Sequence, residues 1–135
     1  FFHRFFQGFA EFLGLRGNAA SLPSQGVGDP GHDGIADSIR RFEALGVATS
    51  FSEVDVRVKM PVDDEREAQQ VAVYSKLLEV AMTEPGCKSF IMWGFSDKLS
   101  WIPRVFPGYG SANILDKDMK PKKAYDALIK TLMGK

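Results

Sequence analysis

The sequence has little that would suit a disulfide-bonded, nucleic-acid-binding or membrane-spanning protein. Its single cysteine, Cys87, excludes an internal disulfide and any zinc site built from cysteines, and it leaves the redox compartment open. The 17 basic and 17 acidic residues give no net charge that would attract nucleic acid or an anionic membrane. No window approaches the roughly 18 uninterrupted apolar residues of a membrane span. We therefore expect neither nucleic acid nor a membrane as a partner.

The composition is that of one ordinary globular domain. The chain has 135 residues, of which 44% are hydrophobic and 25% are charged, enough to bury a core. The opening FFHRFFQGFAEFLGL does not have the form of a secretory signal, because Arg4, Gln7 and Glu11 interrupt it and no small-residue cleavage site follows. The first residue is Phe rather than Met, so we expect a processed or truncated chain.

Residues 1–25 form a region of their own. Phenylalanines recur there at spacings of three and four, which places the aromatic rings on one side of a predicted helix. From Gly14 to Pro23 the composition turns to small and polar residues, which predicts a loop. We accordingly divide the chain into this helix and loop, residues 1–25, and a second region, residues 26–135.

The second region alternates strands and helices. Caps, periodicity and breakers predict a short strand leading to His32, helices beginning at Asp33, at Asp63 or Asp64, and at Pro121, and buried strands at residues 47–58 and 89–95. The helix positions expected to face the core are Ile35, Ile39, Phe42, Leu45, Val71, Tyr74, Leu78, Met82, Ala124, Leu128 and Leu132. This order is typical of an α/β fold in which crossover helices connect parallel strands.

Two carboxylates stand at the end of the first long strand, VATSFSEVDVRV. The period of two places Phe51, Glu53 and Asp55 on one face. A carboxylate on an apolar strand is costly unless it is paired, and sites in parallel folds lie at the carboxyl ends of strands. Glu53 is therefore our first candidate for a working residue. The alternative is that both carboxylates are simply solvated where the strand leaves the sheet.

Two cofactor interpretations are disfavoured by their context. GVGDPG matches G-x-G-x-x-G, but the preceding SLPSQ is polar and is broken by Pro23, unlike the strand of a dinucleotide-binding fold. His32, Glu53 and Asp55 are possible ligands for zinc, manganese or iron, but the only other histidine, His3, lies in the aromatic helix. The same three residues equally suit a hydrogen-bonded network. We expect no metal and no cofactor.

The two tryptophans favour a sugar-binding cleft. Trp93 ends the second long strand, and Trp101 follows in a loop rich in glycine and proline. Flat aromatic faces stack on the C–H faces of pyranose rings, while neighbouring carboxylates bind the hydroxyl groups. For either ring alone, packing in the core is the competing interpretation.

Five ordered motifs carry a family resemblance. GVGDPGH, FSEVDVRV, WGFSDKLSW, ANILD and PKKAY resemble the carboxyl-terminal third of glycoside hydrolase family 10, the retaining endo-1,4-β-xylanases, from about Gly26 to Leu132. The resemblance implies a parallel-stranded partial (β/α)8 barrel that comprises its last three βα units. In the sixth strand, Pro30 replaces a glutamine that is usual in the family.

The resemblance also implies roles for individual residues. Glu53 matches the catalytic nucleophile, His32 the histidine that hydrogen-bonds it, and Asp55 the aspartate that orients that histidine. Trp93 and Trp101 match the tryptophans that wall the sugar sites on the glycone side of the cleaved bond. The implied partner is xylan or a xylo-oligosaccharide, and the implied localisation is secreted.

The proton donor of the family is missing from this sequence. It lies in an Asn-Glu pair after the fourth strand of the barrel, and the chain contains no Asn-Glu pair. We therefore expect a carboxyl-terminal xylanase fragment that is inactive alone and self-associates through open sheet edges. The alternatives are a noncatalytic carbohydrate-binding remnant, a half-barrel that needs a partner, and a globular piece without present function.

Overall fold

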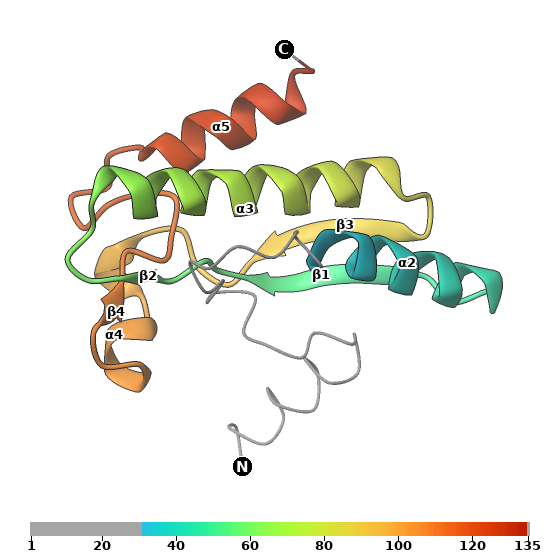
Figure 1. Ribbon diagram of the computed structural model, residues 1–135, viewed down its shortest axis with the longest axis horizontal. Coiled ribbons are helices and arrows are strands. Elements are labelled where there is room, and N and C mark those ends of the chain that lie inside the picture. Colours follow the sequence, from blue (N-terminus) through green and yellow to red (C-terminus); the bar gives the residue numbers. More distant parts are fainter. Residues whose placement is uncertain (1–30, 135) are drawn as a thin grey trace.

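A two-stranded parallel sheet carries Glu53 and leads into Asp55 and Trp93, and helices cover one of its faces (Figure 1). The computed structural model describes residues 31–134, with the backbone alone for residues 31–33. Strand β1 (Thr49–Val54) pairs in parallel with β3 (Cys87–Met92), and helix α3 (Asp64–Thr83) connects them. This unit confirms the crossover arrangement that the alternation of elements predicts.

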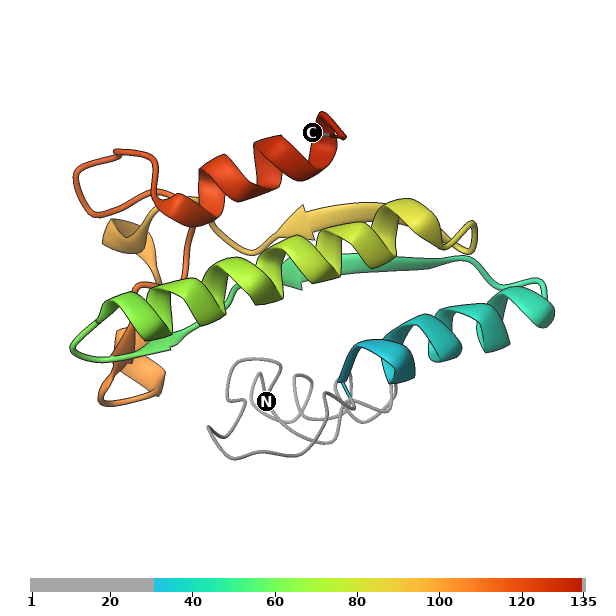
Figure 2. The same ribbon diagram turned by 45° about the horizontal axis from the view of Figure 1, so that its top comes forward.

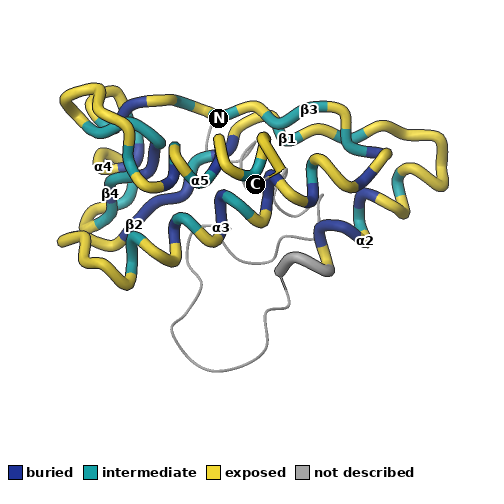
Figure 3. Tube along the Cα trace, turned by 90° about the horizontal axis from the view of Figure 1, so that it is seen from above, coloured by how far each residue is buried: buried dark blue, intermediate teal, exposed yellow. Residues whose placement is uncertain are grey.

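Two further helices complete the covered side. Helix α2 (Gly31–Ala44) lies beside α3 and contacts β1 (Figure 2). Helix α5 (Lys123–Leu132) packs on the outer side of α3. Buried and exposed residues alternate along α3, as Figure 3 shows, because one face of this helix meets the strands and α5.

The ends of α3 follow from its sequence. The side chain of Asp63 accepts a 2.8 Å hydrogen bond from the backbone N–H of Arg66, so Asp63 is the N-cap. Acidic residues in the first turn suit the positive end of the helix dipole. After Thr83 the backbone turns extended at Glu84, just before Pro85.

Three residues expected to face the core are exposed instead: Leu45, Met82 and Leu132. Leu45 lies beyond the end of α2, where the chain turns at Gly46 with a φ of +75°. Met82 stands three turns after the half-buried Val71, at the border of the buried face of α3. Leu132 lies in the last turn of α5, where this helix diverges from α3 (Figure 1).

The predicted strand 47–58 is wrong in extent. β1 ends at Val54, and Val58–Lys59 forms a separate strand, β2, that pairs antiparallel with β4 (Tyr109–Gly110). The long loop between β3 and α5 therefore contains regular structure, including a 3-10 turn, η1 (Asp97–Leu99), and a short helix, α4 (Ile102–Val105).

The two long strands are buried on one face only, which corrects the expectation of buried strands. Ser50, Ser52 and Glu53 are exposed on β1, and Ile91 on β3 is 52% exposed. Register shifts around Phe51 let both Phe51 and Val54 contact the core, so Phe51 does not share the face of Glu53.

Two predicted helix starts differ from those observed. α2 begins at Gly31, before the expected cap Asp33. α5 begins at Lys123, because Pro121 forms an isolated bridge with Leu115 and Lys122 is the N-cap. The predicted helix and loop of residues 1–25 and most of the predicted first strand lie outside the described residues. The domain division and the third parallel strand thus stay predictions.

Candidate active site

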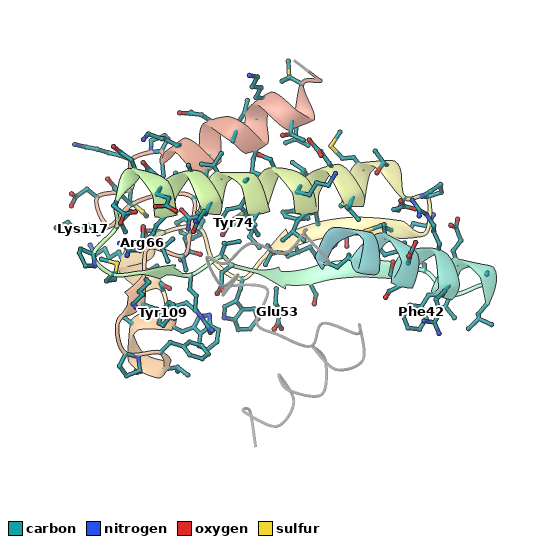
Figure 4. All side chains as sticks on the ribbon, viewed as in Figure 1. Phe42, Glu53, Arg66, Tyr74, Tyr109 and Lys117 are labelled. Carbon is teal, nitrogen blue, oxygen red and sulfur yellow. The ribbon has the colours of Figure 1, made fainter. Side chains whose placement is uncertain are left out.

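Glu53 and Asp55 project from the face of β1 that the helices leave open. Val54 and Val56 both belong to the hydrophobic core, so the alternating positions Glu53 and Asp55 point the other way. Figure 4 shows Glu53 on the side of β1 opposite α3, whereas Tyr74 points from α3 toward the strands. The end of β1 thus presents two carboxylates to the uncovered face.

Trp93 extends the same face on the neighbouring strand. Val54 pairs with Met92, which also packs against the core, and the backbone N–H of Trp93 donates a 3.1 Å hydrogen bond to the Val54 carbonyl. Trp93 therefore lies beside the carboxylates at the carboxyl ends of the strands, and 42% of its surface is exposed. An exposed indole at this place can stack on a ligand.

Trp101 reaches this edge from the long loop. Its Nε1–H donates a 2.7 Å hydrogen bond to Oδ2 of Asp55. Its ring also contacts Phe106 edge to face, with centroids 5.6 Å apart and an interplanar angle of 63°. These two contacts fix the indole at the end of β1.

Burial is the largest of several influences on the pKa of Asp55. Loss of solvent around this carboxylate raises its pKa above the usual range, and the negative charge of Glu53 adds to that effect. The hydrogen bond from Trp101 and the positive charge of Arg57 act in the opposite direction. The Asp55 carboxyl therefore keeps its proton to a higher pH than an ordinary aspartate does, and it lies beside the more exposed carboxylate of Glu53.

A largely buried amine holds the two ends of the long loop together. Nζ of Lys122 lies 3.0 Å from Oδ2 of Asp97, and it donates to the backbone carbonyls of Ser111 and Asn113 at 2.7 and 2.8 Å. Oδ1 of Asp97 accepts from the Asn113 backbone N–H at 2.8 Å. The loop that carries Trp101 thus starts and finishes at one ion pair.

Helix α3 anchors the same loop to the chain after β1. The Tyr74 hydroxyl donates to the Ala112 carbonyl at 2.6 Å and accepts from the Val56 N–H at 3.2 Å. Nε2 of Gln70 donates to the carbonyl of Val56 at 2.7 Å. Burial raises the pKa of the Tyr74 hydroxyl, so it stays protonated and able to donate.

The structure brings together four of the five residues singled out in the sequence, namely Glu53, Asp55, Trp93 and Trp101. The side chain of His32 lies outside the described residues, so its pairing with Asp55 and Glu53 stays a prediction. The hydrogen bond from Trp101 to Asp55 was not anticipated, because nothing in the local pattern of either segment signals it.

Sequence reasoning also missed Arg57 and Phe106. Arg57 follows the carboxylates and is buried, with its guanidinium carbon 3.9 Å from the centroid of the Phe106 ring. Burial lowers the pKa of this guanidinium. The available signal was the arginine two positions after Asp55 together with the aromatic residues of the FPGY segment.

Within the part of the chain that the structure describes, no helix is long and apolar enough to cross a membrane. No three histidine, cysteine, aspartate or glutamate residues of that part are grouped so that they could hold a metal ion. Because the side chain of His32 lies outside the described residues, this search does not test the interpretation of His32, Glu53 and Asp55 as metal ligands.

Comparison with known proteins identifies relatives over most of the chain. Residues 24–131 match the model of the family described as glycosyl hydrolase family 10. Endo-1,4-beta-xylanase 1 of Gibberella zeae is 30% identical over 112 residues, which cover 83% of this chain and 32% of that protein. Endo-1,4-beta-xylanase 2 of Aureobasidium pullulans is 30% identical over 125 residues, which cover 90% of this chain and 35% of that protein.

Solved structures agree with the sequence relatives. Native xylanase 10B from Thermotoga maritima has a TM-score of 0.73 at 33% identity, covering 76% of this chain and 32% of that one. Xylanase 10B from Thermotoga petrophila RKU-1, solved in complex with xylobiose, has a TM-score of 0.73 at 30% identity. The match covers 77% of this chain and 32% of that one. These neighbours imply a (β/α)8 barrel fold. The chain spans about a third of the length of the curated relatives it matches.

Proposed function

Because the chain belongs to glycosyl hydrolase family 10, we propose that it forms the nucleophile side of a retaining endo-1,4-β-xylanase site. It would comprise the last three βα units of the barrel. The observation that carries the proposal is that Glu53, Asp55, Trp93 and Trp101 meet at the carboxyl ends of two parallel strands. Active sites of (β/α)8 barrels are built at those ends.

Glu53 is the attacking group in this proposal. A carboxylate oxygen of Glu53 bonds to the anomeric carbon of the sugar, and the glycosidic C–O bond breaks with its electron pair leaving on the aglycone oxygen. Asp55 cannot take this role as easily, because one of its oxygens already accepts the hydrogen bond from Trp101. Asp55 instead orients the site around Glu53, together with His32.

A second carboxyl group must protonate the leaving oxygen, at about 5 to 5.5 Å from the nucleophile in retaining enzymes. The family's Asn-Glu pair does not occur in this sequence. Loss of the acid alone typically lowers the rate by about 10²- to 10⁴-fold. We therefore propose that the chain is inactive on xylan by itself.

The sugar chain would stack on Trp93 and Trp101. Trp93 is the more exposed of the two rings, and Trp101 is held in place by Asp55 and Phe106. Two solved relatives were crystallised with xylobiose, which supports a xylo-oligosaccharide as the ligand. Secretion is proposed from family membership alone.

Covalent trapping tests the role of Glu53 without needing the missing acid. A 2-deoxy-2-fluoro-β-xylobioside with a dinitrophenolate leaving group departs unprotonated, so attack by Glu53 leaves a stable glycosyl ester. We expect the isolated chain to gain one fluoroxylobiosyl mass on Glu53, and xylan to release no reducing sugar. Intact mass and peptide mapping make the measurement.

Two variants control this experiment. Glu53→Gln should abolish the label, whereas Glu43→Gln, at an exposed position on α2, should retain it. Labelling of another carboxylate, or no labelling of the wild-type chain, overturns the nucleophile assignment. Turnover of xylan at ordinary xylanase rates overturns the proposed inactivity.

A noncatalytic carbohydrate-binding function is the second candidate, favoured by the exposed indole of Trp93. Affinity for xylotriose that survives Glu53→Ala but is lost in Trp93→Ala, together with no trapping of Glu53, would support it. Isothermal titration with both variants separates it from the first proposal.

The uncovered sheet face has a further consequence for partners. Ile91, Trp93 and Phe95 are all exposed at alternating positions of β3 and the residues after it. Apolar faces and open strand edges favour association with another chain. We propose self-association of the isolated chain, or pairing as a half-barrel with a chain that supplies the missing strands. Mixing with the amino-terminal two-thirds of Thermotoga maritima xylanase 10B should restore xylan hydrolysis in the half-barrel case.

A further inference from the structure

Arg57 is a buried cation that forms no side-chain hydrogen bond or ion pair with any described residue. Its exposed fraction is 9%, and its Nε is sealed from solvent without a hydrogen-bond partner. Burying a charged donor in this way is costly and requires a compensating interaction. The negative charge of Asp55 compensates in part, and two rings lie against the cation: the guanidinium carbon is 3.9 Å from the Phe106 ring centroid and 5.0 Å from that of Tyr109.

These contacts continue to the candidate sugar site. Phe106 meets the Trp101 indole edge to face, and Trp101 donates its hydrogen bond to Asp55. Asp55 and Arg57 are two residues apart in one segment. The contacts therefore run from Arg57 through Phe106 and Trp101 to Asp55. The first and last residues of this series lie in the same short segment after β1.

We propose that Arg57 is a positioning residue for Trp101, holding Phe106 so that the indole keeps its place at the end of β1. The inference rests on the proposed function only for the claim that Trp101 binds a sugar. The placement of the indole is a separate claim about this chain. Asp55 holds one atom of the indole and Phe106 contacts the ring edge to face, so loss of Arg57 weakens the support that Phe106 gives to the orientation of the ring.

A planar guanidinium suits this task better than an ammonium group. It stacks on an aromatic face over several atoms, and its weak hydration lowers the cost of burial. Lysine at position 57 would keep the charge and lose the stacking. We therefore expect Arg57→Lys to be intermediate between the wild type and Arg57→Met.

The test uses ¹⁵N-indole NMR, with the Trp101 signal assigned by its persistence in Trp93→Phe. In Arg57→Met we expect the Trp101 Nε1–H resonance to shift and to exchange faster with solvent, while the Trp93 resonance stays in place. Affinity for xylotriose should fall by about five- to thirty-fold, within the range of cation–π contacts from exposed to desolvated sites. Arg104→Met is the matched control, because Arg104 is exposed in the same loop and its guanidinium stacks on no ring among the described residues.

Each result decides the inference. An unchanged Trp101 resonance in folded Arg57→Met overturns it. If Arg57→Met does not fold, Arg57→Lys decides, and an unchanged resonance there overturns it equally. A displaced Trp101 resonance without any xylotriose binding by the wild type supports the positioning role of Arg57 and overturns the proposed sugar site.

Discussion

The Nε1–H of Trp101 donates a 2.7 Å hydrogen bond to Oδ2 of Asp55, which lies 46 residues earlier in the chain. This bond joins the end of β1 to the loop after β3 and brings an indole beside the carboxylates. The hydrogen bond also lowers the pKa of Asp55, which partly offsets the increase caused by burial. The protonation of Asp55 and the placement of Trp101 are therefore linked.

Asp55→Asn should change how stability depends on pH. Burial raises the pKa of Asp55 above its usual value of about 3.9, so the folded state binds this proton more tightly than the unfolded state. The free energy of unfolding that Asp55 contributes is present below the unfolded pKa and is lost as pH rises through the folded pKa. We expect the stability of the wild type relative to Asp55→Asn to fall as pH rises above about 4.

Urea denaturation of both chains across this pH range makes the measurement. Asp118→Asn, which removes an exposed carboxylate, is the control. A relative stability that rises with pH would contradict this expectation. It would mean that Trp101 and Arg57 lower the pKa of Asp55 by more than burial raises it.

Tyr74→Phe should weaken the anchor between α3 and the long loop. The Tyr74 hydroxyl is fully buried and bonds both the Ala112 carbonyl and the Val56 N–H. Removing it leaves the Ala112 carbonyl with its bond from Val56 alone, so we expect a loss of about 1 to 2 kcal/mol in the free energy of unfolding. Urea denaturation measures the loss. Tyr125→Phe, whose hydroxyl has no hydrogen bond to a described residue, should cost much less.

The helices and the parallel pair could be predicted because their signals are local. Asp63 caps α3, Gly46 follows α2, and apolar residues recur along each buried face. The wrong predictions of core residues lie at the ends of helices, beyond the packed core. Leu45 and Leu132 continue the apolar periodicity, but both are mostly exposed, at 77% and 55%.

The carboxylates and tryptophans of the site could also be found in the sequence, since each stands at the end of a predicted strand or in the loop after it. The contacts between these residues could not be predicted from the sequence. The bond between Asp55 and Trp101 and the stacking of Arg57 on Phe106 join residues far apart in the chain. Spacing rules act within one element and do not reach such contacts.

Lys122→Met should loosen the loop that carries Trp101. The side chains of Lys122 and Asp97 are 11% and 14% exposed, and loss of the amine leaves the Asp97 carboxylate buried without its counter-charge. Breaking a buried pair from one side costs about 3 to 5 kcal/mol, and the remaining N–H donor from Asn113 favours the lower end.

Adding Asp97→Asn to Lys122→Met gives a double variant that tests whether the lost free energy of unfolding comes from the unpaired charge of Asp97. The double variant should be less destabilised than the sum of the two single variants. Lys130→Met, which removes an exposed lysine from α5, is the control for charge alone. Additive losses would show that Lys122 and Asp97 act independently of one another.

Charged substitutions on the open face should reduce the proposed self-association. Ile91 and Phe95 are 52% and 50% exposed on the face that carries Trp93, whereas Ile129, 44% exposed, lies on the helical side. Lysine is unfavourable at a strand edge that pairs with another chain, so Ile91→Lys and Phe95→Lys should lower the oligomeric fraction while Ile129→Lys leaves it unchanged. Sedimentation velocity over a concentration series makes the measurement. A wild-type chain that stays monomeric throughout, or equal effects of all three substitutions, would contradict association through this face.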